Sequence, residues 1–131
     1  MKTLIVYSLM FITSVVGCDP EDINPNTDNS IDGTWNLTHV SGGIDGRNLT
    51  FDTGVIVWTF NEETGMVTIV NSSDNGLSVF QSGTYSFLIE EMGGHKTISI
   101  NGMDFGIIDI SADKINIDQE VADGIFLELT K

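Results

Sequence analysis

The sequence predicts an all-β protein, folded as an antiparallel up-and-down β-barrel of eight strands. From Gly33 onward, apolar and polar side chains alternate in short runs that recur roughly every 8–12 residues, which is typical of barrels and sandwiches. Turn residues separate these runs, and no stretch after Cys18 keeps the 3.6-residue apolar period of a helix. We expect a closed barrel because closure removes the unpaired edges through which open sheets aggregate.

The first four expected strands each show this alternation. Residues 35–40 (WNLTHV) alternate along their length, and residues 55–60 (VIVWTF) are apolar on both faces with the heavier side chains at every second position. Residues 66–70 (MVTIV) return along the chain, and residues 84–89 (TYSFLI) alternate cleanly. A period of two residues is that of a strand with one buried face.

The last four strands are shorter but follow the same rule. They are expected at residues 97–101 (TISIN), 105–110 (FGIIDI), 115–117 (INI) and 125–130 (IFLELT). An eight-stranded barrel is just wide enough to be filled with side chains or to hold one small ligand. The strand count alone leaves both interiors open.

Turn residues define the connections. Residues 42–48 are interpreted as a loop because they contain three glycines with Asp, Arg and Asn, and residues 61–65 (NEETG) as a hairpin connection. Asn101-Gly102 is the strongest two-residue hairpin signal, because both residue types tolerate positive φ angles. Further turns are expected at residues 71–76, 93–94 and 111–114.

The first 17 residues have the features of a secretory signal peptide. Lys2 precedes an apolar run at residues 4–16, whose 13 residues fall short of the ~20 that a membrane-spanning helix needs. The run ends in Val15-Val16-Gly17-Cys18, which resembles the lipobox of bacterial lipoproteins. We expect cleavage before Cys18 and acylation of its thiol. The alternatives are a buried free thiol, or an ordinary signal peptide cut elsewhere.

Residues 18–31 are predicted to be an acidic tether that leads from the lipid to a domain at residues 32–131. Without residues 1–17, four basic residues face 19 acidic ones, a net charge of −15. This charge argues against nucleic-acid binding, which depends on Lys and Arg, and against attachment to anionic lipids through a basic patch. The membrane contact is therefore expected through acyl chains on Cys18. The acidic residues after Cys18 fit an outer-membrane lipoprotein, facing either the periplasm or the cell surface.

Gly33-Thr34-Trp35 resembles the Gly-x-Trp motif that opens the first strand of lipocalins. With the lipobox and the strand rhythm of residues 32–131, the chain resembles small bacterial lipocalin-like domain lipoproteins. In that family the tryptophan packs across the closed end of the barrel, commonly under an Arg from the last strand, where this sequence has only Glu128 and Lys131 as charged residues. Many members bind small hydrophobic molecules. The resemblance therefore implies a ligand cavity, lined in this chain by Trp58, Phe60, Tyr85 and Phe87.

Three other patterns suggest chemistry but have simpler explanations. Asp52-Thr53-Gly54 matches the catalytic triplet of aspartic proteases, but it occurs once and without the usual flanking residues, so we interpret it as a turn. His39 and His95 lie 56 residues apart with no recognised metal-ligand spacing. An acidic set in and next to the tether also lacks the spacing of a calcium loop; it comprises Asp19, Glu21, Asp22, Asp28 and Asp32. We expect no catalytic residue, metal or cofactor.

Two hypotheses follow. The first is a non-enzymatic, lipid-anchored lipocalin-like lipoprotein that carries a small hydrophobic ligand inside its barrel. The second is a structural or protein-interaction module whose barrel is filled and whose surface meets an unidentified protein. The volume of the interior distinguishes them, because a ligand-carrying barrel needs an apolar cavity of several hundred Å³.

Overall fold

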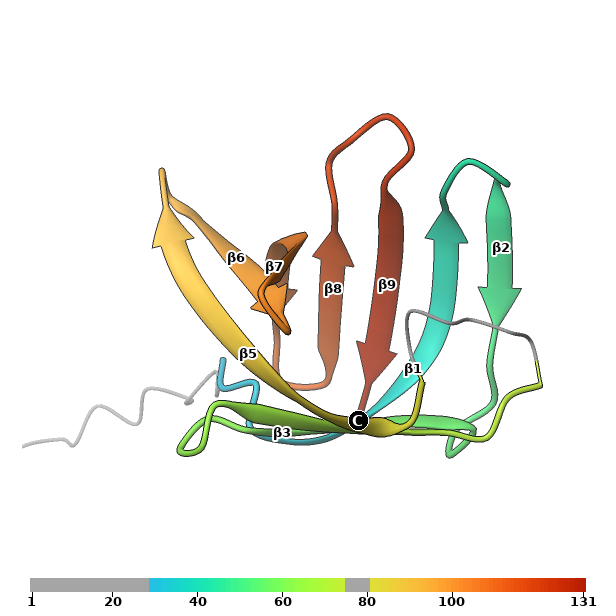
Figure 1. Ribbon diagram of the computed structural model, residues 1–131, viewed down its shortest axis with the longest axis horizontal. Coiled ribbons are helices and arrows are strands. Elements are labelled where there is room, and N and C mark those ends of the chain that lie inside the picture. Colours follow the sequence, from blue (N-terminus) through green and yellow to red (C-terminus); the bar gives the residue numbers. More distant parts are fainter. Residues whose placement is uncertain (1–28, 75–80) are drawn as a thin grey trace, which may run out of the picture.

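The computed structural model describes residues 29–74 and 81–131, which form nine antiparallel strands and no helix (Figure 1). The strands are β1 (Gly33–Gly42), β2 (Arg47–Thr50), β3 (Ile56–Asn61), β4 (Met66–Asn71), β5 (Gly83–Met92), β6 (His95–Ile100), β7 (Met103–Ile110), β8 (Lys114–Asp118) and β9 (Ile125–Thr130). None of these elements is a helix long and apolar enough to cross a membrane. The predicted signal peptide, Cys18 and most of the tether lie outside the described residues.

Eight of the strands form a closed up-and-down barrel, as predicted. The strand order is β1-β3-β4-β5-β6-β7-β8-β9, and β9 pairs back onto β1 from Asn36↔Thr130 to Gly42↔Ile125. A β-bulge between Leu37 and His39 interrupts this last ladder. Because β9 pairs with β1, neither strand leaves an unpaired sheet edge where the barrel closes.

Strand β2 corrects the prediction for residues 42–48, which were expected to be a loop. The turn is shorter, and Arg47–Thr50 pair with the second half of β1 through Gly42↔Arg47 to His39↔Thr50. The first half of β1 pairs on the same edge with β3. Gly43 and Gly46 adopt φ angles of +78° and +59°, which lets the chain reverse within four residues. This strand was not predicted because Arg47–Thr50 is polar, with Leu49 as its only apolar residue.

The interior of the barrel is apolar. Alternate residues of the barrel strands point inward except where bulges interrupt β1 and β7, and within the described residues every fully buried side chain is hydrophobic. Three of the largest are Trp35, Trp58 and Phe60, with isoleucines from β6, β7 and β8 facing them from the opposite wall. The alternation predicted from sequence correctly separates interior from exterior positions in most of these strands. In β1 it is wrong at the end of the strand, because the bulge between Leu37 and His39 leaves Val40 buried and His39 half-buried.

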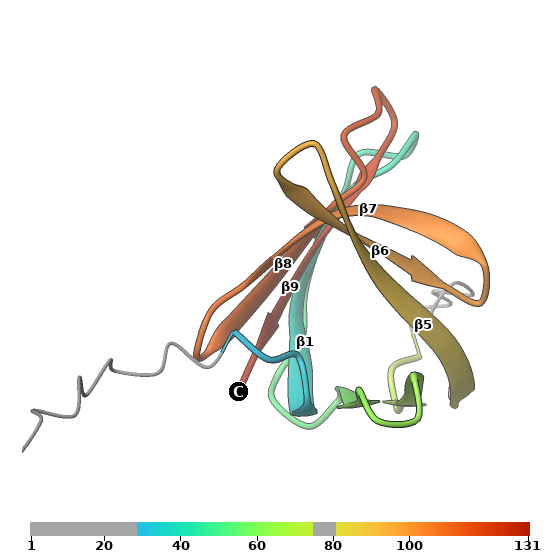
Figure 2. The same cartoon turned by 90° about the vertical axis from the view of Figure 1, so that its left-hand side faces the viewer.

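One end of the barrel is sealed by the segment that leads into β1. Ile31 is fully buried, and its carbonyl oxygen accepts a hydrogen bond of 2.7 Å from Nε1 of Trp35. The ammonium group of Lys131 lies 4.6 Å from the centre of the Trp35 ring. Figure 2 shows residues 29–32 entering β1 near the C-terminus. The cation over the Trp35 ring therefore comes from Lys131, which directly follows β9.

Candidate functional site

An apolar pocket in the barrel wall is the candidate ligand site. It lies where β6 turns into β7, and its volume is about 40 Å³. Its walls are formed by Trp58, Ile69, Tyr85, Ile100, Asn101, Met103 and Phe105. This volume suits a few water molecules at most, whereas pockets for drug-sized ligands measure roughly 300–1,000 Å³. In the described part of the chain, the pocket is therefore a small gap in a packed wall.

Two of the four predicted cavity residues line this pocket. Trp58 is fully buried in its wall, and Tyr85 is half-buried with its hydroxyl donating to the backbone oxygen of Gln81 at 3.0 Å. This bond gives the polar end of Tyr85 a partner away from the apolar wall.

The other two predicted residues, Phe60 and Phe87, pack against each other. Their ring centres lie 5.2 Å apart in an edge-to-face arrangement, and Phe60 also contacts the Trp58 ring at 5.9 Å. These distances are typical of favourable aromatic pairs. Within the described residues, these aromatic side chains therefore pack on one another on the inner face of the barrel wall.

Sequence reasoning missed Asn101 and Met103 as pocket residues. Asn101 lies in the β6–β7 turn and Met103 follows it; in this turn Asn101 adopts a φ angle of +53° and Gly102 one of +75°. The Asn-Gly signal correctly predicted the turn. The turn lies beside the pocket because β6 pairs with β5 and β7. A local sequence pattern does not predict which strands pair.

The Asp52-Thr53-Gly54 triplet forms a tight turn between β2 and β3. The backbone N–H of Val55 donates to the carbonyl of Asp52 at 3.2 Å, and Gly54 adopts a φ angle of +88°. The N–H of Gly54 donates to Oδ1 of Asn36 at 3.0 Å. All three residues of the triplet are exposed, which agrees with their interpretation as a turn.

The two histidines lie in different surroundings. Nε2 of His39 lies 2.7 Å from Oδ1 of Asn48, and the ring packs edge-on against Phe126. His95 is exposed at the start of β6. Among the described residues, no group of three His, Cys, Asp or Glu side chains could hold a metal ion. Asp32, from the acidic set, instead accepts a hydrogen bond of 2.9 Å from the N–H of Glu62.

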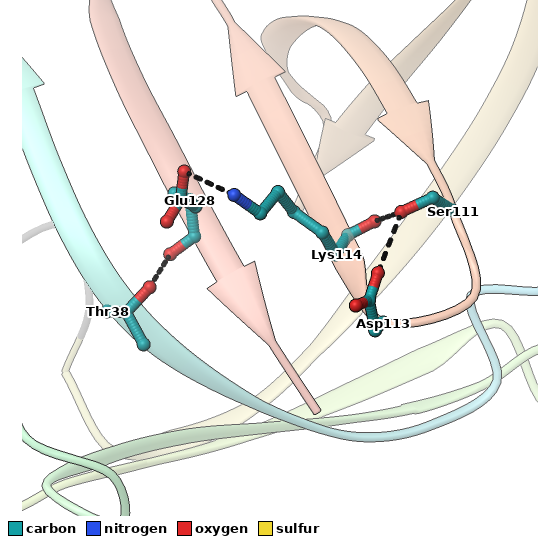
Figure 3. Close-up of polar contacts among 5 residues, drawn as sticks. All are labelled: Thr38, Ser111, Asp113, Lys114 and Glu128. Atoms are coloured by element: carbon teal, nitrogen blue, oxygen red, sulfur yellow. Dashed lines mark hydrogen bonds and ion pairs between the residues drawn. The ribbon is translucent and has the colours of Figure 1, made fainter.

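A polar network on the outer surface links the strands next to the closing seam (Figure 3). Nζ of Lys114 on β8 lies 3.2 Å from Oε2 of Glu128 on β9, and the hydroxyl of Thr38 on β1 donates to the Glu128 carbonyl at 3.2 Å. In the adjoining turn, the hydroxyl of Ser111 bonds the Lys114 carbonyl at 3.0 Å. Lys114 and Glu128 are both partly exposed, so their ion pair contributes about 1 kcal/mol or less. The network supports the sheet rather than a chemical step.

A second, polar hollow opens where the ladder between β6 and β7 ends. The pairing stops at Thr97↔Ile107, and beyond it a hollow of about 250 Å³ lies between the β5–β6 hairpin and the end of β7. Its charged walls carry both signs, with Glu91 and Asp109 near His95 and Lys96. The hollow is open and lies outside the apolar core.

No family model, curated protein or solved structure matches this chain. The barrel itself is compatible with the lipocalin-like fold that the Gly-x-Trp motif suggests.

Proposed function

We propose that this protein is an exported, lipid-anchored, lipocalin-like lipoprotein that acts through its outer surface as an interaction module. The observation that carries the proposal is the interior formed by the described residues: its apolar pocket measures about 40 Å³, and aromatic side chains pack on one another beside it. A barrel filled in this way offers a rigid surface instead of a cargo cavity. The proposed role is non-enzymatic.

The lipid anchor is supported by the order of segments along the chain. The apolar run, the small residue before Cys18 and the acidic residues after it agree with a lipobox. The tether enters the domain at the sealed end, where Ile31 is buried beneath Trp35. This end would lie nearest the membrane, and the outer wall of the barrel would remain accessible. We place the protein in the outer membrane, on either its periplasmic or its outer face.

Native mass spectrometry of the soluble domain, residues 19–131, tests the filled interior. The domain is purified from a bacterial host without detergent, and its native mass is compared with its denatured mass. We expect the bare polypeptide in both. A reproducible extra mass that leaves on denaturation would contradict the proposal and show that the barrel carries a cargo.

Carriage of a small apolar ligand is the second candidate, and the composition of the pocket favours it. Trp58, Tyr85 and Phe105 provide aromatic walls, and Met103 is 56% exposed at the rim. A methionine side chain is flexible, so its movement would widen the entrance. Titration with a fluorescent fatty acid distinguishes the candidates: saturable binding that Met103→Trp abolishes supports carriage, and absence of binding supports the interaction module.

A further inference from the structure

The outer wall of the barrel is divided into an uncharged half and a charged half. Along β3 and β4, the outward side chains are Val57, Thr59, Asn61, Met66, Thr68 and Val70, and none carries a charge. Across the barrel, β7, β8 and β9 present Asp104, Asp109, Lys114, Asp118 and Glu128. Fifteen of the 19 acidic residues of the chain lie within residues 32–131, so an uncharged wall across adjacent strands is a marked departure from the rest of the surface.

A row of four threonines crosses the centre of this uncharged wall. The pairings Thr34↔Thr59, Thr59↔Thr68 and Thr68↔Thr84 place one threonine on each of β1, β3, β4 and β5. All four are exposed. We call these four residues, together with Val70 and Leu88, the threonine face. Val70 is 52% exposed and Leu88 is 55% exposed, so the face also offers apolar surface.

The threonine hydroxyls already have partners within the face. The Oγ1 atoms of Thr34 and Thr59 lie 3.4 Å apart, and those of Thr68 and Thr84 lie 3.2 Å apart. Covering a hydroxyl costs free energy mainly when its hydrogen bonds are lost. Because each hydroxyl here is within reach of a neighbour on the same face, another surface can cover the row at a low desolvation cost.

The geometry points to a second copy of this chain as the partner of the threonine face. A symmetric dimer brings the same patch of both copies together, so the patch must be complementary to itself. An acidic patch fails this condition, because two copies of it repel each other. The threonine face satisfies it, and a hollow of about 240 Å³ beside Leu88, between β5 and β6, offers space for a side chain of the other copy. This inference rests on the proposed function, because it names the surface and the partner of the interaction module.

Acidic residues surround the threonine face, as expected for the polar rim of an interface. Glu62 and Glu63 lie in the β3–β4 turn, and Asp74 follows the other end of β4. Protein interfaces typically have few charges at the centre and a polar rim. Two acidic rims repel each other across the dimer, and salt screens that repulsion. Dimer formation should therefore increase with ionic strength, opposite to the behaviour of a dimer held by ion pairs.

The lipid anchor explains why a small face would suffice. Four strands at a spacing of ~4.8 Å give a patch well below the ~800 Å² per partner of a standard stable interface. Anchored molecules share one membrane plane, which raises their effective concentration and favours weak contacts. We therefore expect dimers of the acylated chain in its membrane.

Cysteine cross-linking of the full chain in bacterial membranes tests this inference. Cys18 is the only natural cysteine and its thiol is expected to be acylated, so an added cysteine is the one reactive thiol. Thr59→Cys, treated with a short bis-maleimide, should give a cross-linked dimer whose yield rises with added NaCl. Asp109→Cys, on the charged half of the wall, should remain a monomer.

Charge substitutions provide the matched comparison. Adding Thr68→Asp to the Thr59→Cys chain places a carboxylate in each copy of the face and should reduce the dimer yield at least tenfold. Adding Ala112→Asp, an equal charge in an exposed turn, should leave the yield unchanged. No dimer from Thr59→Cys, or equal dimer from Asp109→Cys, would overturn the inference. Two other measurements test the proposed function. The intact mass of each chain shows whether it is acylated, and the native mass of the domain shows whether it carries a cargo. Failure of the proposed function can therefore be distinguished from failure of the dimer inference.

Discussion

Lys131, the last residue of the chain, holds its ammonium group 4.6 Å from the ring centre of Trp35, near the start of β1. The contact joins the two strands whose pairing closes the barrel, β9 and β1. The Trp35 side chain itself is fully buried. A cation over an indole ring is stabilising even where the cation itself is exposed.

Lys131→Met should lower the free energy of unfolding by about 0.5–1 kcal/mol, because it removes the charge over Trp35 while keeping a chain of similar length. Lys131→Arg should retain the stability. The measurement is urea unfolding followed by tryptophan fluorescence. Lys96→Met, which removes an exposed charge from β6, is the control. Equal losses from Lys131→Met and Lys96→Met would show that general electrostatics, and not the ring contact, is responsible.

Gly106→Ala should destabilise the barrel by about 3 kcal/mol or more. Gly106 adopts a φ angle of +101° beside the bulge between β6 and β7, and a Cβ atom there would collide with the backbone of Asp118 and Gln119. Gly94→Ala is the matched control, since Gly94 also has a positive φ angle, +84°, but no atom lies within 4 Å of its Cβ position. It should cost only about 1–2 kcal/mol from backbone strain. Thermal unfolding compares the two variants, and similar losses would disprove the collision.

The barrel strands could be predicted because their side chains alternate between a buried and an exposed face. β2 could not, since its pairing with β1 depends on backbone hydrogen bonds and only Leu49 marks it as a strand. The packing of the interior also depends on contacts between strands, which the sequence does not show. The sequence places Trp58, Phe60 and Phe87 on the inner face, but whether aromatic rings line a cavity or fill it depends on how they pack across strands. The contact between Lys131 and Trp35 likewise requires the closure of β9 onto β1.

Trp58→Ala should enlarge the apolar pocket of about 40 Å³ into a cavity that holds a small ligand. Removing a buried tryptophan costs about 3–5 kcal/mol and leaves an apolar space that small aromatic molecules can enter. Indole should therefore raise the melting temperature of Trp58→Ala and leave that of the natural chain unchanged. Ile69→Ala, a smaller deletion in the same pocket wall, gives a second test if Trp58→Ala does not fold. Stabilisation of the natural chain by indole would show that its interior is already open.

Cys18→Ala should abolish acylation and block normal removal of the signal peptide, because the lipobox requires the cysteine thiol. The variant should accumulate as an unprocessed precursor, and mass spectrometry should find no acyl chains. Ser14→Ala changes a residue of the same apolar run without touching the cysteine and should leave processing intact. The measurement is the mass of the chain in the membrane fraction, compared with the natural protein. A Cys18→Ala chain that is still processed and membrane-bound would contradict the lipobox interpretation, and with it the membrane confinement on which the proposed dimer depends.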